Sequence, residues 1–218
     1  MGPREREPRQ WDPDDCLRLF FAVVLPPELQ EAVGGLQERL RDVRAEVTWV
    51  AAHNLHFTIK FIGHVPARMV RDLRQAAATV AVECEPHTVE VAGVGAFPSL
   101  KRPQTIWVGV GEGAPALSAL AAHLIRALDE GALVPRDARP FRPHCTIGRA
   151  RNPKDAARLA EALGREAGFA AGRMTCDSFQ LMSSELKPSG PTYTRIATFP
   201  LRARGEGLER TRERGGVS

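Results

Sequence analysis

The chain opens with a dense apolar run that is followed by a regular amphipathic pattern. Residues 17–25 are almost wholly apolar, as in a buried strand. The run ends at Pro26 and Pro27, which cannot continue a strand ladder and favour the start of a helix. Apolar side chains then recur at steps of four and three residues, which places them on one helix face. They are Leu29, Val33, Leu36, Leu40 and Val43.

The rest of the chain alternates between strand and helix patterns in the same way. Proline begins three further helices, from Pro66 to about residue 83, from Pro115 to about residue 131, and from Pro153 onward. Strands are predicted at 47–50, 55–63, 88–97, 105–111, 174–184 and 192–201, with a turn at 188–191. Pro140 and Pro143 keep residues 139–150 extended. This order predicts an α+β fold in which helices lie on antiparallel sheet.

Length and composition suit one large globular domain or two fused lobes. The chain has 218 residues, of which 43% are apolar and 26% charged. We expect the domain to span residues 17–201, preceded by a flexible extension at 1–16 and followed by a disordered tail at 202–218 that is rich in Arg, Glu and Gly. The apolar runs are too short to cross a bilayer, and the N-terminus lacks a secretory signal pattern. We therefore expect a cytoplasmic protein with no membrane partner.

Charge and cysteine usage narrow the function only slightly. The formal net charge is +4 and nearly all cations are arginines, whose planar guanidinium suits phosphate. So small a charge does not establish a nucleic-acid partner by itself. The four cysteines form no Cys-x-x-Cys pair, which favours free thiols over a disulfide framework or zinc ribbon. No glycine-rich phosphate loop lies between a strand and a helix.

Two similar tetrapeptides carry the candidate chemistry. Residues 56–59 read His-Phe-Thr-Ile and residues 144–147 read His-Cys-Thr-Ile, each within a predicted strand. Because alternate side chains share a strand face, the His and Thr of each copy point one way and the two apolar residues point the other. A single strand histidine is more often structural than catalytic, but packing has no reason to repeat an imidazole with a threonine at the same offset. The repeat favours a joint functional role.

The residue types in these motifs suit opening of a phosphodiester. With an ordinary pKa near 6.5, one imidazole of a pair removes a proton at neutral pH while the other donates one. The hydroxyls of Thr58 and Thr146 suit hydrogen bonds to phosphate oxygens, and Arg149 follows the second motif closely enough to balance the charge.

The sequence resembles the 2H phosphoesterase superfamily, and specifically the RNA 2′,3′-cyclic phosphodiesterases once called 2′-5′ RNA ligases. The resemblance extends from Leu17 to Leu201 and is carried by residues 18–22, 54–63, 95–109, 139–149 and 193–201, including both motifs. It implies two pseudo-symmetric lobes, each an antiparallel sheet backed by helices, around a central active-site groove. It further implies a monomer that acts without metal or cofactor on RNA ending in a 2′,3′-cyclic phosphate.

The resemblance also implies roles for individual residues. His56 protonates the leaving 3′ oxygen as general acid, and His144 activates the attacking water as general base, so that a 2′-phosphate remains. Thr58, Thr146 and Arg149 hold the phosphate. Because the two motifs are alike, the sequence alone does not decide which imidazole carries the proton.

Four further side chains are candidate substrate contacts. Lys60 shares the face of His56 if the strand alternates regularly, although a solvated lysine explains it equally well. Relatives use an aromatic residue from the first strand to stack a terminal base, which points to Phe20 or Phe21, with core packing as the competing interpretation. Arg142 is a candidate contact to the RNA backbone.

Three alternatives remain open. His53 and His56 have the His-x-x-His spacing of a metal ligand pair, but no third ligand accompanies them, and strand positions three apart face opposite sides. The chain could instead bind RNA ends without turnover. A third alternative keeps the chemistry but changes the substrate to 2′-5′-linked oligonucleotides, to a small cyclic nucleotide, or to RNA ends that are joined in the reverse reaction.

Overall fold

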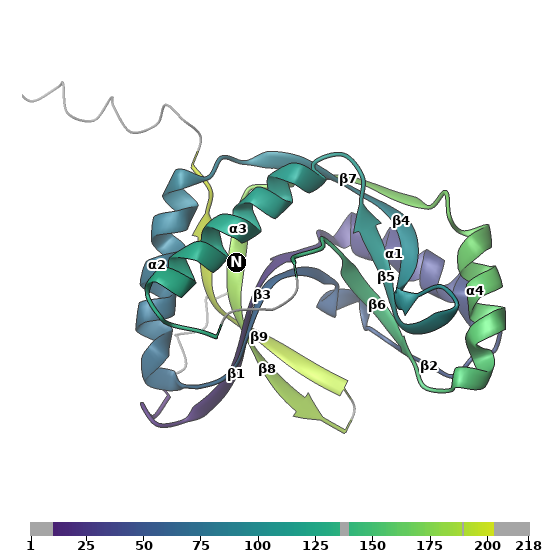
Figure 1. The fold of residues 1–218 in the computed structure, drawn as a ribbon, viewed down its shortest axis with the longest axis horizontal. Coiled ribbons are helices and arrows are strands. Elements are labelled where there is room, and N and C mark those ends of the chain that lie inside the picture. Colours follow the sequence, from purple (N-terminus) through teal and green to yellow (C-terminus); the bar gives the residue numbers. More distant parts are fainter. Residues whose placement is uncertain (1–10, 136–139, 189, 203–218) are drawn as a thin grey trace, which may run out of the picture.

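The fold combines one curled antiparallel sheet with four helices (Figure 1). The computed structural model describes residues 11–135, 140–188 and 190–202. The strands are β1 Cys16–Val24, β2 Val47–Trp49, β3 His56–Pro66, β4 His87–Ser99, β5 Arg102–Val110, β6 Cys145–Ala150, β7 Ala170–Cys176, β8 Ser178–Lys187 and β9 Gly190–Pro200. The helices are α1 Pro27–Arg41, α2 Val70–Glu83, α3 Ala114–Glu130 and α4 Ala156–Arg165, with short 3₁₀ turns at Ala52–Asn54, Ala67–Met69 and Pro153–Asp155. The predicted α+β class is confirmed.

The first strand and helix form where the apolar pattern predicts them. Strand β1 ends just before Pro26, and Pro27 is the first residue of α1. Four of the five predicted apolar positions of this helix are at most 5% exposed, whereas Val43 follows the end of the helix and is partly buried. Amphipathic spacing thus fixes which face of α1 is turned to the core.

The sheet consists of two similar halves. The first half is β3-β1-β8-β9 and the second is β6-β5-β4-β7, with β2 paired to β6. Helices α2 and α3 cover the first half, and α1 and α4 lie against the second (Figure 1). Each half is therefore an antiparallel sheet backed by two helices, as expected, but the two halves form one continuous sheet through β3 and β6.

Two of these helices pack on the half that the preceding strand does not belong to. Helix α1 follows β1 of the first half but packs against β7, while α3 follows β5 of the second half but packs against α2 and β3. The buried side chains form a single hydrophobic cluster that draws on both halves. The sequence pattern predicts the helices but not this exchange.

Three segments differ from the prediction or lie outside it. The single strand expected at 174–184 is two strands, β7 and β8, because the chain breaks between them at Asp177. Residues 13–15 precede β1, and the carbonyl of Asp15 accepts a hydrogen bond from the amide of Ala67 at 2.8 Å. Residues 11–16 of the predicted extension are described, with Cys16 already in β1, whereas residues 1–10, and residues 203–218 of the predicted tail, lie outside the described residues.

Two other expectations concern the chain as a whole. The four cysteines, Cys16, Cys84, Cys145 and Cys176, are free thiols as predicted. In the described part of the chain, none of the helices has the length and apolar character that a membrane-spanning helix needs.

Candidate active site

The two histidine motifs meet where the two halves of the sheet join. One residue pair, Phe57 with Cys145, links β3 to β6, and both side chains are fully buried. Because the strands are antiparallel, the positions that flank this pair lie opposite one another, with His56 beside Thr146 and Thr58 beside His144. The structure thus brings the two motifs together around a local two-fold axis. We call the side of the sheet that carries these His and Thr side chains the motif face.

The two imidazoles are oriented in the same way. The Nδ1 atom of His56 lies 2.7 Å from the carbonyl oxygen of Asn54, and the Nδ1 atom of His144 lies 2.7 Å from that of Arg142. Since a carbonyl only accepts hydrogen bonds, Nδ1 carries the proton in both rings. This leaves Nε2 of each ring as the atom that exchanges protons. In His56 that atom accepts a hydrogen bond from the Thr58 hydroxyl at 3.0 Å.

Burial and charge both favour the neutral form of His56. Loss of hydration is the largest effect and lowers the pKa of this imidazole below its usual 6.5. The Asn54 carbonyl raises the pKa in part, and a positive charge on His144 lowers it again. The two rings are therefore close enough for the charge of His144 to act on His56.

Aromatic side chains from three strands enclose the imidazoles. The His56 ring packs against Phe20, with ring centroids 5.0 Å apart, and meets the edge of Tyr193 at 5.3 Å. His144 makes a similar edge contact with Phe97 at 4.9 Å. Tyr193 and Phe97 lie outside the repeat, so the motif pattern did not predict that they contact the imidazoles. Phe20, a predicted substrate contact, lies on the motif face but is only 3% exposed, so its direct contact is with His56.

Phe21, the other aromatic candidate in β1, is not part of the site. Its side chain is fully buried on the opposite side of the strand and packs against Phe179 and Phe199 at 6.0 and 6.1 Å. The proposal that Phe21 contacts substrate is therefore wrong, since alternation turns it into the core.

A β-bulge in each motif decides which later side chain joins the motif face. In β6, Ile147 is the extra residue between the pairs Trp107–Thr146 and Ile106–Gly148. The Ile147 side chain is buried, and Gly148 lies opposite the buried Ile106, so both positions face the core side of the sheet. Arg149 therefore points to the motif face, like Thr146. Without the bulge, Arg149 would point away from Thr146.

The equivalent bulge in β3 overturns the prediction for Lys60. Ile59 is the extra residue there, and Lys60 lies opposite the buried Phe21 rather than in phase with Thr58. Its side chain is 2% exposed, and Nζ donates a hydrogen bond to the carbonyl of Pro135 at 3.3 Å. Lys60 therefore lies on the core side of the sheet and away from the motif face, because regular alternation ends at the bulge.

Arg149 is exposed and is held at the edge of the motif face. Its Nη1 atom donates a hydrogen bond to the Thr105 hydroxyl at 3.1 Å, and its positive charge is close enough to lower the pKa of Tyr193. Burial is the larger effect on Tyr193 and raises that pKa overall. The side chain of Arg142 is exposed, and its contact with substrate stays a prediction, whereas its backbone carbonyl orients His144.

A buried glutamine supports the bulge that carries Arg149. The Gln37 side chain on α1 is 4% exposed, and its Nε2 atom donates to the carbonyls of Ile147 and Val50, both at 2.8 Å. The amide of Val50 also donates to the Ile147 carbonyl, at 3.0 Å. The carbonyl of Ile147, the bulge residue, therefore accepts a hydrogen bond from a side chain of α1. Sequence patterning gave no signal for Gln37, because polar residues on α1 are expected at the surface.

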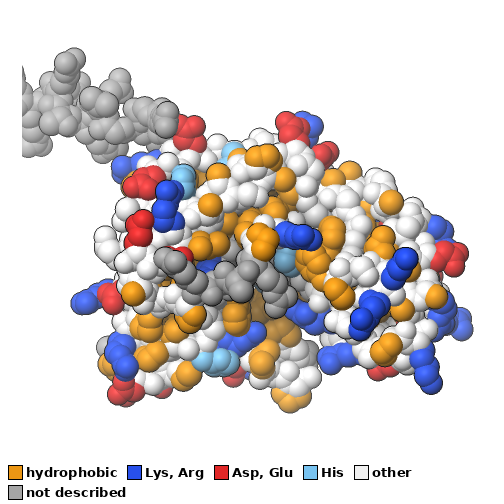
Figure 2. Space-filling model, in the orientation of Figure 1, with side chains coloured by type: hydrophobic (Ala, Val, Ile, Leu, Met, Phe, Trp, Pro, Cys, Tyr) orange, Lys and Arg blue, Asp and Glu red, His pale blue; other side chains and the backbone are white. Residues whose placement is uncertain are grey.

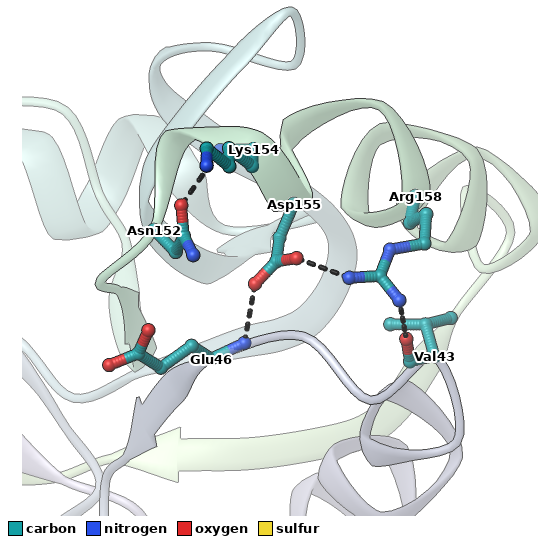
Figure 3. Close-up of polar contacts among 6 residues, drawn as sticks. All are labelled: Val43, Glu46, Asn152, Lys154, Asp155 and Arg158. Atoms are coloured by element: carbon teal, nitrogen blue, oxygen red, sulfur yellow. Dashed lines mark hydrogen bonds and ion pairs between the residues drawn. The ribbon is translucent and has the colours of Figure 1, made fainter.

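The strand that flanks Arg149 is anchored by a second buried polar group (Figure 3). The carboxylate of Asp155 accepts a hydrogen bond from the amide of Glu46 at 2.7 Å and pairs with Arg158, which also donates to the carbonyl of Val43. These bonds hold the segment that leads into β2, whose Thr48 lies opposite Arg149. They lower the pKa of Asp155 below its usual range, the amide hydrogen bond having the largest effect.

The described residues, 11–135 with 140–188 and 190–202, contain no group of three or more His, Cys, Asp or Glu side chains placed to hold a metal ion. Lys and Arg side chains are spread over the visible surface and interleaved with other residue types (Figure 2). The motif face carries two imidazoles, two threonine hydroxyls and, at its edge, the Arg149 guanidinium.

The same architecture occurs in solved structures of other proteins. One protein of Thermus thermophilus overlaps 86% of this chain and all of its own, with a TM-score of 0.72 and 30% sequence identity. Escherichia coli LigT, in a complex with 3′-AMP, overlaps 87% of this chain and all of its own, with a TM-score of 0.69 and 25% identity. The fold is thus of the LigT type.

Sequence comparison leads to the family. A model described as the 2′-5′ RNA ligase superfamily matches residues 25–188. A protein of Methanothermobacter thermautotrophicus named RNA 2′,3′-cyclic phosphodiesterase is 32% identical over 85% of this chain and 99% of its own length. A Thermus thermophilus protein of the same name is 33% identical over 85% of this chain and 91% of its own. The chain belongs to the 2′-5′ RNA ligase superfamily, and the resemblance seen in its motifs is confirmed.

Proposed function

We propose that this protein hydrolyses 2′,3′-cyclic phosphate ends of RNA and leaves a 2′-phosphate. The observation that carries the proposal is the matched pair His56 and His144 on the motif face, with Nδ1 of each ring held by a carbonyl and Nε2 available for proton transfer. Several family members that align over most of their length have names that state this activity.

The proposed reaction needs one proton removed and one supplied. His144 takes a proton from water through Nε2 while the water oxygen attacks phosphorus. The bond from phosphorus to the 3′ oxygen breaks, and His56 donates its Nε2 proton to that oxygen. Each such transfer is worth roughly 10²–10⁴ in rate. The Thr58 and Thr146 hydroxyls and the Arg149 guanidinium stabilise the negative charge that grows on the phosphate oxygens.

The lowered pKa of His56 places a condition on this assignment. A general acid must be protonated, whereas burial makes His56 neutral near pH 7 before substrate binds. The cyclic phosphate carries one negative charge, and an anion beside an imidazole raises its pKa. We therefore propose that binding of the anionic substrate raises the pKa of His56 and so favours its protonated form. We also propose that turnover requires neither metal nor cofactor. We further propose that the protein acts as a monomer in the cytoplasm.

The direct test is to incubate the protein with a short RNA that ends in a 2′,3′-cyclic phosphate and to identify the product. We expect a 2′-monophosphate in the presence of EDTA. His56→Gln and His144→Gln should each lower kcat by about 10²-fold or more. His53→Gln is the matched control, because His53 is exposed and outside the repeat, and it should leave turnover unchanged.

Other outcomes separate the alternatives. Binding of this RNA without any product defines a binding module and refutes the enzymatic proposal. Loss of turnover in EDTA, or in His53→Gln, points to a metal hydrolase. A second candidate function is suggested by the name of the family model, because a 5′-hydroxyl that attacks in place of water joins two RNA ends. Adding RNA with a 5′-hydroxyl and observing a longer product would support that activity.

A further inference from the structure

The first half of the sheet has no counterpart of Arg149 at the equivalent strand position. The two bulges make the positions correspond, so that Ile59 matches Ile147, Lys60 matches Gly148 and Phe61 matches Arg149. Phe61 is 47% exposed, which is high for so large an apolar side chain, and lies on the motif face. The local symmetry between the motifs is therefore broken at the position of Arg149.

A guanidinium from the neighbouring strand takes that place. The Arg18 side chain of β1 lies over the Phe61 ring, with 4.7 Å from Cζ to the ring centroid. Its Nη1 atom donates a hydrogen bond to the Ser184 hydroxyl of β8 at 2.8 Å, and Ser184 is only 8% exposed. These two contacts hold the guanidinium in a fixed orientation. A guanidinium has five N–H donors, and this bond uses one.

Arg18 belongs to the same group of side chains as His56. Arg18 comes two residues before Phe20 in β1, so both side chains lie on the motif face, roughly 7 Å apart along the strand. Phe20 in turn packs on His56. The charges of Arg18 and Arg149 both act on Tyr193, whose ring meets the edge of His56. The site thus lies between two guanidinium groups, one from each half of the sheet.

We propose that Arg18 binds the phosphodiester on the 5′ side of the terminal nucleotide. This rests on the proposed function, in which His56, His144 and Arg149 engage the terminal cyclic phosphate. Arg18 lies on the motif face beyond Phe20, which packs on His56. The phosphodiester one nucleotide away from the cyclic phosphate is the next anion that an RNA offers. The substrate class is then an RNA of two or more nucleotides in preference to a cyclic mononucleotide. Guanidinium groups suit such a contact because they pair with phosphate oxygens in a fixed geometry.

The test compares two substrates that differ by one adenosine and the phosphodiester that links it. They are adenosine 2′,3′-cyclic phosphate and the dinucleotide ApA with a 2′,3′-cyclic phosphate end. The wild-type protein should have the higher kcat/KM for the dinucleotide. Arg18→Gln should lower the ratio of the two kcat/KM values about tenfold, the loss expected for one charge-assisted hydrogen bond. Ser184→Ala should lower the ratio by less, because it loosens Arg18 without removing it.

Two controls keep the result specific. Arg126→Gln removes one positive charge from the exposed side of α3 and should leave the ratio unchanged. Salt dependence gives an independent measurement, because one phosphate contact to a single strand adds about 0.7 to the slope of log affinity against log salt concentration. This increment should be present for the wild type with the dinucleotide and absent in Arg18→Gln.

The outcomes decide between this proposal and the proposed function separately. Equal losses on both substrates, or no loss on either, overturn the role of Arg18 even when both are hydrolysed. If the wild type hydrolyses neither substrate, the proposed function fails. The role of Arg18 is then tested by comparing how tightly the protein binds the dinucleotide and the mononucleotide that end in a 2′-phosphate. Tighter binding of the dinucleotide that is lost in Arg18→Gln supports the contact, and equal binding overturns it.

Discussion

Replacing Gln37 with methionine tests whether the bulge in β6 is held from behind the sheet. Methionine keeps the unbranched shape and the helix propensity of glutamine but has no N–H donor. The change removes the two 2.8 Å hydrogen bonds to the carbonyls of Val50 and Ile147. The Ile147 carbonyl still accepts a hydrogen bond from the amide of Val50, so the loss of the Gln37 hydrogen bond weighs more on the carbonyl of Val50.

The size of the effect follows from this loss. A buried polar group left without its partner costs about 1–3 kcal/mol in free energy of unfolding. We expect Gln37→Met to lie in this range, since Gln37 is 4% exposed and water does not readily replace it. The loosened bulge should also weaken the hold on Arg149, two residues further along the strand. We therefore expect KM for the cyclic phosphate to rise by up to about tenfold, with little change in kcat.

Urea unfolding measures the stability, and initial rates on the cyclic-phosphate RNA measure kcat and KM. Gln30→Met is the matched control. Gln30 lies on the same helix and donates one hydrogen bond, at 2.7 Å, to the carbonyl of Leu25, which follows β1 and is not part of the bulge in β6. It should lower stability without raising KM. A stability loss in Gln37→Met with KM unchanged would refute the reasoning, because Gln37 would then support the fold and not the placement of Arg149.

Three further predictions use single residues. The NMR titration of His56 should give a pKa below 6.5, and Tyr193→Ala should raise it, because hydration of the imidazole increases; an unchanged or lower value contradicts this. Asp155→Asn should lower Tm near pH 7. Because the pKa of Asp155 is lowered in the folded protein, its carboxylate stabilises the fold above about pH 4, and the difference in Tm from wild type should shrink as the pH falls below that value. A difference that stays constant with pH would show that the charge of Asp155 is not its cause. Lys60→Met should leave KM within about twofold, because a side chain on the core side of the sheet makes no charge-assisted bond to phosphate; a large rise would return Lys60 to the site.

Most of the elements could be predicted from the sequence. Apolar steps of three and four predicted the core face of α1, because that inference depends on local periodicity. The repeat of His and Thr predicted two motifs that lie together, as the pairing of β3 with β6 shows. The α+β class follows from the order of those elements.

The remainder depends on how strands pair, which local periodicity does not contain. Alternation predicts that Phe20 and Phe21 face opposite sides, but not which of them reaches the core. A bulge is defined only relative to the partner strand, so the change of phase at Ile59 that turns Lys60 to the core side was not visible. The same change of phase at Ile147 is what brings Arg149 to the motif face.

Residues outside the repeat were missed for a related reason. Tyr193 and Phe97 lie in predicted strands that look like ordinary core sequence, and only the sheet order brings them to the imidazoles. Gln37 was missed because a polar side chain on an amphipathic helix is normally solvated.

The exchange of α1 and α3 between the two halves of the sheet means that neither half is a continuous stretch of chain. The chain leaves the first half immediately after β1 and rejoins it only at β3, while α3 comes from the second half to cover the first. Each half completes its core with a helix that follows a strand of the other, so neither half folds to completion alone. The two histidines therefore stand on halves whose buried side chains belong to one shared hydrophobic cluster.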